Sequence, residues 1–200
     1  MKAGSFLVAN FIFFVAVVIG MFMEPAFAAV NWTNANANND FNDLGNWNPV
    51  PLSLNYQDCY INELSGENKT EISYTLSGNP VDLYVVVVDA NTGELLISGG
   101  NNTITNRMRV GRFNGTGIVT ITDRTLNVLN TYTTFGDTGT AVLTMSGGTL
   151  NIDRVTFGQT AGDSCTLNIS AGMININTSD ATPASNRGSL RMGSVTLIST

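Results

Sequence analysis

The sequence predicts an all-β fold: a right-handed parallel β-helix, or solenoid, with about 24 residues per coil. First, a short apolar-polar-apolar pattern recurs four times at a constant interval, ending at Ile97, Ile121, Met145 and Ile169. Second, three of the copies continue with a further run of the same kind. Third, glycine, asparagine and threonine are abundant and only 12% of the residues are charged, which favours turns and strands over helices.

Residues 1–28 have the pattern of a secretory signal peptide. Lys2 precedes an apolar run from Phe6 to Met23, and Ala26-Phe27-Ala28 is a small-x-small cleavage site. We therefore expect a mature chain that starts at Ala29 and is secreted or held at the cell surface. The alternative is an uncleaved membrane anchor, since the apolar run is long. No second apolar stretch is long enough to span a bilayer.

Residues 29–54 are predicted to form an N-terminal cap. The stretch from Asn31 to Asp40 is rich in asparagine, which alone would be typical of disorder. Disordered segments usually lack aromatic residues, whereas this one contains the apolar set Trp32, Phe41, Leu44 and Trp47. Terminal units of a stack must be blunted against edge-to-edge pairing. We therefore expect these side chains to cover the first coil.

Residues 55–200 are predicted to form the solenoid itself. In the clearest coil, three short strands cover Met108–Val110, Ile118–Ile121 and Leu126–Val128. Because alternate strand residues share a face, two internal ladders are expected. They are Leu95, Val119, Leu143 and Leu167, and then Ile97, Ile121, Met145 and Ile169. An antiparallel β-sandwich is the alternative, but it has no reason to keep a constant period over four copies.

The C-terminal part departs from the period. Residues 177–189 are predicted to form a loop at one corner, and Val195–Ser199 reads as a strand that stops in the middle of a coil. We expect a stack that is truncated at this end. An uncapped coil presents unpaired strand groups, which predicts self-association through the C-terminal end.

The two cysteines are predicted to be free thiols. Cys59 and Cys165 are more than four repeats apart, roughly 20 Å in a stack with a coil spacing of about 4.8 Å. A disulfide cannot bridge that distance. A bridge would require the N-terminal segment to fold back along the stack.

The composition excludes several kinds of chemistry. The chain contains no histidine and has a net charge of −6, so histidine-dependent catalysis is excluded and nucleic acid is not an expected partner. Asp123, Arg124, Asp153 and Arg154 are the candidates for a cluster that cleaves polysaccharide. The register places the two aspartates at different corners, so they do not form an acid/base pair. We predict no catalytic residue and no cofactor.

Two polar series remain as candidate binding groups. Asp89, Asp137 and Asp163 each lie near a glycine turn, but one carboxylate per turn falls short of the six or more oxygens that calcium takes, so no metal site is predicted. Asn127, Asn151 and Asn175 recur once per repeat on the outer face. They are interpreted either as an amide ladder that stabilises the stack or as a polar strip that binds a glycan ligand.

Several segments resemble known repeats. Ile97–Gly100, Val110–Gly117 and Leu143–Ile152 are similar to β-helical repeats of bacterial cell-surface proteins, namely autotransporter passenger-type repeats and those of PEP-CTERM or planctomycete exported proteins. The stretch from Trp32 to Pro51 resembles the leader that precedes such repeats.

The resemblance implies an exported structural or adhesive protein without catalytic activity. The alternative is a carbohydrate-binding or polysaccharide-degrading β-helix of the lyase or hydrolase type. The expected partner is a cell-surface polysaccharide or a second copy of the chain.

Overall fold

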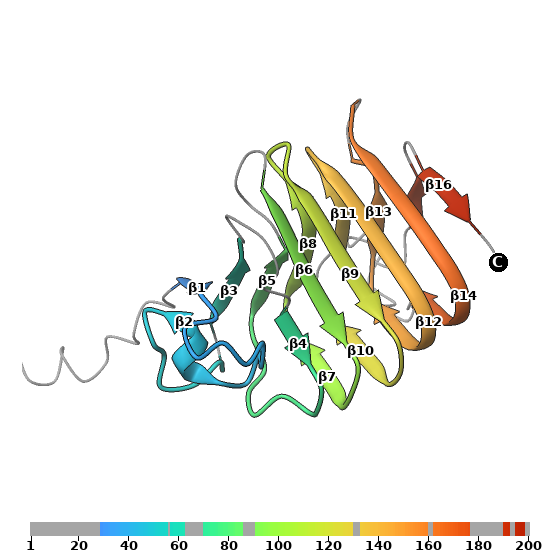
Figure 1. Ribbon diagram of the computed structural model, residues 1–200. Helices are drawn as coiled ribbons and strands as arrows, with labels where there is room; N and C mark the ends of the chain where they lie inside the picture. Colours follow the sequence, from blue (N-terminus) through green and yellow to red (C-terminus); the bar gives the residue numbers. More distant parts are fainter. Residues whose placement is uncertain are drawn as a thin grey trace, which may run out of the picture.

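The computed structural model describes residues 29–55, 57–62, 70–85, 91–129, 133–159, 162–176, 190–192 and 195–198. These residues form a β-solenoid whose parallel coils stack along one axis (Figure 1). The all-β fold and the predicted coil length are confirmed. The predicted signal peptide and the predicted loop at residues 177–189 lie outside the described residues.

One wall of the stack is a sheet that we call the first sheet. Its order is β15-β13-β11-β8-β5-β3-β1-β2, and every neighbouring pair is parallel except β1 with β2. The strands are β1 (Ala29–Trp32), β2 (Trp47–Asn48), β3 (Asp58–Ile61), β5 (Asp82–Val85), β8 (Arg107–Arg112), β11 (Thr133–Asp137), β13 (Val155–Phe157) and β15 (Leu190–Met192).

The opposite side consists of two rows of strands. The second sheet has the order β16-β14-β12-β9-β6-β4, with the strands β4 (Thr70–Ile72), β6 (Thr92–Ile97), β9 (Thr116–Ile121), β12 (Thr140–Ile152), β14 (Ser164–Ile176) and β16 (Val195–Ile198). The third row contains β7 (Asn101–Ile104), β10 (Thr125–Val128) and the second halves of β12 and β14. The four coils that begin at β5, β8, β11 and β13 thus contribute three strand segments each, as the sequence predicted.

The core consists of ladders of apolar side chains from successive coils. Leu95 aligns with Val119, Leu143 and Leu167, and Ile97 aligns with Ile121, Met145 and Ile169. Both predicted ladders are therefore confirmed. Their members are at most 4% exposed, apart from the partly buried Ile169. Parallel pairing places each residue next to its equivalent in the following coil. The sequence period therefore gives the pairing register directly.

The third row begins one coil earlier than the sequence pattern indicated. Asn102 and Ile104 of β7 align with Leu126 and Val128 of β10. Asn102 therefore occupies an internal position and is 1% exposed. Its Oδ1 accepts from the backbone N–H of Leu76 at 2.9 Å, and its Nδ2 donates to the carbonyl of Gly99 at 2.9 Å. Both hydrogen-bonding groups are satisfied, which is why a polar residue is tolerated in the core.

The N-terminal segment covers the first edges of both sheets. β2 pairs antiparallel with β1, the last parallel strand of the first sheet. On the second sheet, Phe41 N–H donates to the carbonyl of Glu71 at 2.9 Å, and Glu71 N–H donates to the carbonyl of Asn39 at 2.7 Å. The segment therefore occupies edges that would otherwise be open for pairing.

Aromatic packing fixes this segment in place. The ring of Trp47 packs edge-on against Trp32 at 5.2 Å and against Phe41 at 4.9 Å. Its Nε1–H donates to the carbonyl of Phe41 at 3.0 Å. The short 3-10 helix η1 (Leu44–Asn46) precedes Trp47 and turns the chain back toward β1. All three rings are at most 5% exposed.

Cys59 and Cys165 are free and buried, as predicted. They lie on different walls of the solenoid, in β3 of the first sheet and β14 of the second. Burial is the main cause that raises the pKa of both thiols. The pKa of Cys165 is raised to about 12.

Candidate functional site

The predicted asparagine strip is a hydrogen-bonded ladder between coils. Asn127, Asn151 and Asn175 align in the third row, and each side chain is partly buried. Asn151 Nδ2 donates to Asn127 Oδ1 at 2.8 Å, and Asn175 Nδ2 donates to Asn151 Oδ1 at 2.9 Å. Asn127 Nδ2 in turn donates to the carbonyl of Asn102 at 3.2 Å. The amide ladder is thus present, while its contribution to stability and a glycan-binding role for the strip stay predictions.

The charged residues considered for polysaccharide cleavage are not brought together in a coil. Asp123 and Arg124 lie at the corner between β9 and β10, whereas Asp153 and Arg154 lie between β12 and β13. Asp123 and Arg124 form a loose ion pair, Oδ2 to Nε, at 3.5 Å, with side chains that are 65% and 63% exposed. The expected placement at different corners is confirmed.

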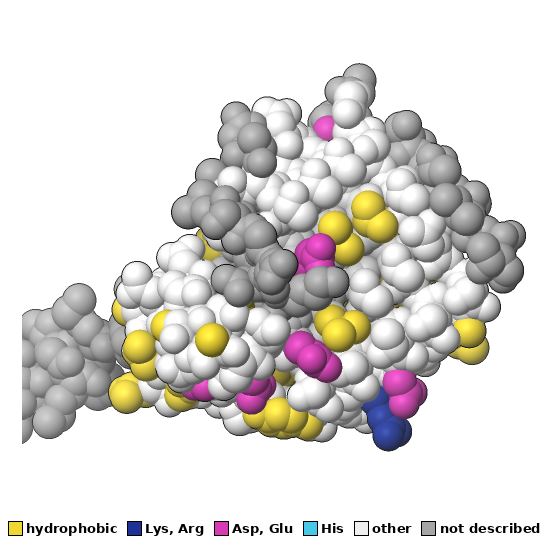
Figure 2. All heavy atoms as spheres, viewed as in Figure 1, with side chains coloured by type: hydrophobic (Ala, Val, Ile, Leu, Met, Phe, Trp, Pro, Cys, Tyr) yellow, Lys and Arg dark blue, Asp and Glu magenta, His cyan; other side chains and the backbone are white. Residues whose placement is uncertain are grey.

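The corner that holds Asp123 and Arg124 is hollowed into a groove of about 730 Å³, which we call the corner groove. It crosses four coils, because the turn after β4, the β6–β7 turn, the β9–β10 turn and the bend within β12 all border it. The lining residues are Ser73, Tyr74, Thr75, Ser98, Gly99, Gly100, Asn101, Asp123, Arg124, Thr125, Gly148 and Thr149. On the face shown in Figure 2, backbone and uncharged, non-hydrophobic side chains cover most of the described surface, with few charged side chains.

A backbone kink shapes this corner. In successive coils, the same corner position has a positive φ: 74° at Gly100, 77° at Arg124, 74° at Gly148 and 101° at Gly172. A Cβ at Gly100 would come within 2.3 Å of the Thr75 backbone nitrogen, so a side chain does not fit there. Glycine adopts this conformation without strain, and arginine does not. Arg124 is therefore the exception among its equivalents.

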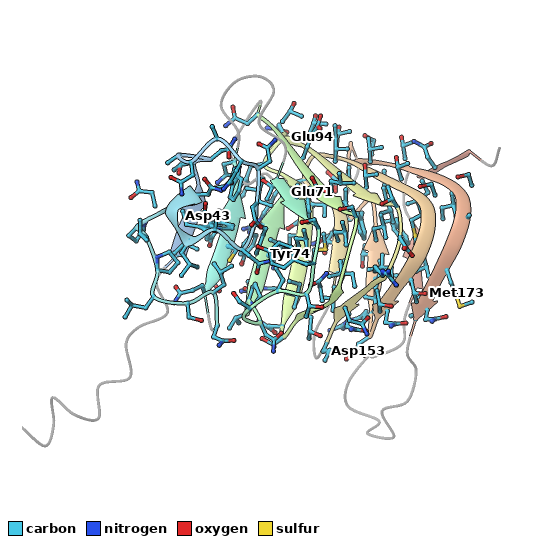
Figure 3. All side chains as sticks on the ribbon, turned by 60° about the horizontal axis from the view of Figure 1, so that its bottom comes forward. Asp43, Glu71, Tyr74, Glu94, Asp153 and Met173 are labelled. Atoms are coloured by element: carbon cyan, nitrogen blue, oxygen red, sulfur yellow. The ribbon has the colours of Figure 1, made fainter. Side chains whose placement is uncertain are left out.

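Tyr74 is the aromatic residue of the corner groove. Its side chain is 49% exposed, and its hydroxyl donates to Asp40 Oδ2 of the N-terminal segment at 2.5 Å. This hydrogen bond is the main reason that the pKa of the Tyr74 hydroxyl is raised. Close by, Ser98 Oγ donates to Glu71. Glu71 and Tyr74 lie on the face turned forward in Figure 3.

A second cluster lies on the outer face of the first sheet, and sequence reasoning missed it. Asp58, Asp82 and Arg107 align in successive strands, and so do Tyr60, Tyr84 and Arg109. The sequence signal was present, since the members of each row are separated first by one repeat and then by slightly more than one repeat. The second spacing is one residue longer than the repeat, so these rows do not follow a strict period.

This cluster is internally satisfied. Asp82 is 2% exposed and accepts hydrogen bonds from Asn106 Nδ2 at 2.7 Å, from the Tyr84 hydroxyl at 3.0 Å and from Arg107 Nε. The Tyr60 and Tyr84 rings stack at 4.5 Å with an angle of 4° between their planes. Burial first, and then the Asp82 carboxylate, raise the pKa of Asp58.

The aspartate next to this cluster interacts with cationic groups. Asp137 Oδ2 lies 3.2 Å from Arg109 Nη1 and 3.2 Å from Arg112 Nε, with its side chain 8% exposed. Two guanidinium groups thus face this carboxylate. Across the residues that the structure describes, no group of three or more His, Cys, Asp or Glu side chains is placed to hold a metal ion.

Comparisons with known proteins add no identity. The chain matches no protein-family model, no curated protein and no solved structure. Within the described ranges, no helix has the length and apolar character needed to cross a membrane. The repeat resemblance therefore stands at the level of a β-solenoid, and its finer assignment to cell-surface families becomes a proposal.

Proposed function

We propose that this protein is an exported structural or adhesive β-solenoid of the bacterial cell-surface type, without catalytic activity. The observation that carries the proposal is that polar side chains on the outer face form hydrogen bonds from one coil to the next. Asn151 bonds to Asn127, and Ser164 Oγ donates to Thr140 Oγ1 at 3.1 Å, so outward polar groups join one coil to the next. Such bonding reinforces the stack along its axis, as an elongated scaffold requires.

The engagement of the carboxylates supports a non-catalytic role. Asp82 and Asp137 are buried against arginine side chains, while Asp123 is exposed and pairs with Arg124. A catalytic acid or base must reach the substrate and exchange a proton with it. In Asp82 and Asp137, the carboxylate is instead held by other groups of the protein.

Export is tested by expressing the full chain with a C-terminal tag in a bacterial host. We expect tagged protein outside the cytoplasm whose N-terminus, measured by mass spectrometry, is Ala29. A double substitution of Ala26 and Ala28 by leucine should block cleavage, because the cleavage site needs small residues. Recovery of the unaltered chain only in the cytoplasm, with Met1 intact, contradicts the proposal.

Polysaccharide cleavage is the second candidate function, and one observation favours it. Asp58 and Asp82 are register neighbours on adjacent strands, and the pKa of Asp58 is raised. Most glycoside hydrolases use two neighbouring carboxyl groups, one of which is a general acid with a raised pKa. Release of reducing ends from a polysaccharide panel, abolished by Asp58→Asn and kept in Asp153→Asn, would support this function over the structural one.

Self-association through the C-terminal coils is part of the same proposal. Ile174 and Ile176 are partly exposed, and Met173 is 56% exposed, whereas Leu150 and Ile152 of the previous coil are buried. A second copy that stacks on this edge would bury these side chains. Sedimentation should show concentration-dependent association that Met173→Lys together with Ile176→Lys suppresses. A monomer at all concentrations overturns this part.

A further inference from the structure

We propose that the corner groove binds a neutral oligosaccharide, with the ring of Tyr74 as a platform and the Asp123–Arg124 pair as the polar contact. The biological role of such binding rests on the proposed adhesive function. The binding itself is argued from the groove alone. The volume of about 730 Å³ lies in the usual range of ligand sites, about 300–1,000 Å³.

The first argument is that the aromatic ring is held in place before any ligand arrives. The Tyr74 hydroxyl is bonded to Asp40, which belongs to the N-terminal segment, while half of the side chain stays open to solvent. An exposed ring whose polar end is already engaged offers only its apolar surface to a ligand. The C–H face of a sugar ring packs well on such a surface, and a fixed ring loses little entropy on binding.

The second argument is the charge balance of the groove. Asp123 and Arg124 are the charged side chains that line it, and they lie 3.5 Å from each other. Their charges offset, so the lining has no excess charge that would select an ion. A carboxylate and a guanidinium together present two acceptor oxygens and several N–H donors. Vicinal hydroxyl groups of a sugar match that set, and the remaining lining is mainly hydroxyl and backbone groups.

The third argument is the shape of the groove and the surface beside it. It crosses four coils, or three coil spacings, which is about 14 Å at about 4.8 Å per coil. That length suits several linked rings better than one small molecule. Thr125 and Thr149 of the lining lie two residues before Asn127 and Asn151 on the same strands, so they share a face with them. The asparagine ladder therefore lies on the same outer face, beside the groove.

The fourth argument is the backbone of Arg124. Its φ of 77° is a conformation that glycine adopts in the three equivalent corners. A non-glycine residue in this region is strained, and strain of this kind concentrates at binding sites. Gly100, Arg124 and Gly148 are the corner positions that line the groove, and Arg124 is the one among them that carries a side chain.

The test is a binding measurement on the purified chain. Neutral oligosaccharides (cello-, xylo-, manno- and chitohexaose) and anionic ones (oligogalacturonate and oligoalginate) are screened on an array and then titrated by calorimetry. We expect at least one neutral series to bind and the anionic series to bind more weakly or not at all. Tyr74→Ala should weaken binding about tenfold or more, while Tyr74→Phe, which keeps the ring, should weaken it less.

Arg124→Gly separates binding from folding. Because glycine suits the corner backbone, this variant should keep or raise the melting temperature and still lose most of the affinity. Phe113→Ala is the matched control, since Phe113 is an exposed aromatic residue at another turn, 47% exposed. Absence of binding to every neutral oligosaccharide, preference for the anionic ones, or binding unchanged by both groove variants overturns the proposal. These outcomes are independent of export, which the N-terminal mapping tests.

Discussion

Arg124 and Gly148 occupy the same corner of successive coils, with φ angles of 77° and 74°. The carbonyl of Arg124 accepts from the N–H of Thr149 at 2.7 Å, directly after that glycine. A Cβ placed on Gly148 would lie 2.5 Å from the same carbonyl oxygen. The corner is therefore built for glycine, and Arg124 is accommodated at a conformational cost.

We predict that Arg124→Gly stabilises the fold. A left-handed conformation costs a non-glycine residue about 1–2 kcal/mol, and the greater freedom of glycine in the unfolded chain offsets about half of it. The free energy of unfolding should rise by about 0.5–1 kcal/mol. Arg124→Ala is the control, because alanine keeps the Cβ and should change stability by less than about 0.5 kcal/mol. Chemical denaturation of the three proteins measures the difference, and equal stability of the glycine and alanine variants would mean that the corner is unstrained.

The amide ladder should contribute measurable stability. Asn151→Ala removes the bond donated to Asn127 and the bond accepted from Asn175. At about 0.5–1.5 kcal/mol per hydrogen bond, we expect a loss of about 1–2 kcal/mol. Thr166 is a partly buried polar residue on the outer face of β14, between two buried core residues. Thr166→Ala should cost less stability. Thermal unfolding compares the two, and similar losses would mean that the ladder adds nothing beyond a polar surface residue.

The inside and outside faces of β12 should respond oppositely to lysine. Met145 is fully buried in the second internal ladder, so Met145→Lys places an unpaired charge in the core. The expected loss is at least about 3 kcal/mol. Thr144, one residue away, points outward and is partly buried, with only a long contact of 3.5 Å from Asn168. Thr144→Lys should be nearly neutral, and matching effects in denaturant titrations would refute the inward orientation of Met145.

The carboxylate of Asp82 should be more important for stability than that of Asp123. Asp82→Ala leaves Asn106, Tyr84 and Arg107 without their common acceptor in a buried setting, and we expect a loss of about 3 kcal/mol. Asp123→Ala removes an exposed ion pair and should cost no more than about 1 kcal/mol. Denaturant midpoints measured for both variants check the ranking. A reversed order would show that the outer cluster of the first sheet is not a structural network.

The buried thiols should make stability fall at alkaline pH. Burial raises the pKa of Cys165 from its ordinary value of 9.0 to about 12. Between these values the unfolded thiol has released its proton and the folded one has kept it. The free energy of unfolding therefore decreases as pH rises from about 9 to 12, and Cys165→Ala should flatten that decrease.

The same burial predicts slow reaction with a thiol reagent at pH 8 in the folded protein. Both cysteines should react after unfolding without prior reduction, because both are free. Peptide mapping that finds an intrachain disulfide would contradict this.

The amino-acid sequence by itself determined the fold class, the coil length and the core register. A stacked coil requires each internal residue to lie above its equivalent, so the constant period that runs through Ile97, Ile121 and Met145 specifies which residues pair. The spacing of Asn127, Asn151 and Asn175 likewise specified an outer ladder before any geometry was known. These features are local in each coil and repeated, which makes them visible in one dimension.

Only the tertiary structure decided which side chains lie next to each other where successive coils have turns of different length. The corner groove joins Tyr74, from a turn that lacks the repeat, to Arg124 two coils later, and Asp40 orients that ring from the N-terminal segment. The rows that contain Asp82 and Arg107 are displaced by one residue from the strict period. In both cases, which side chains meet depends on how the corners accommodate turns of different length. The repeat constrains the aligned strand residues, whereas the corners between unequal turns follow from how the coils stack.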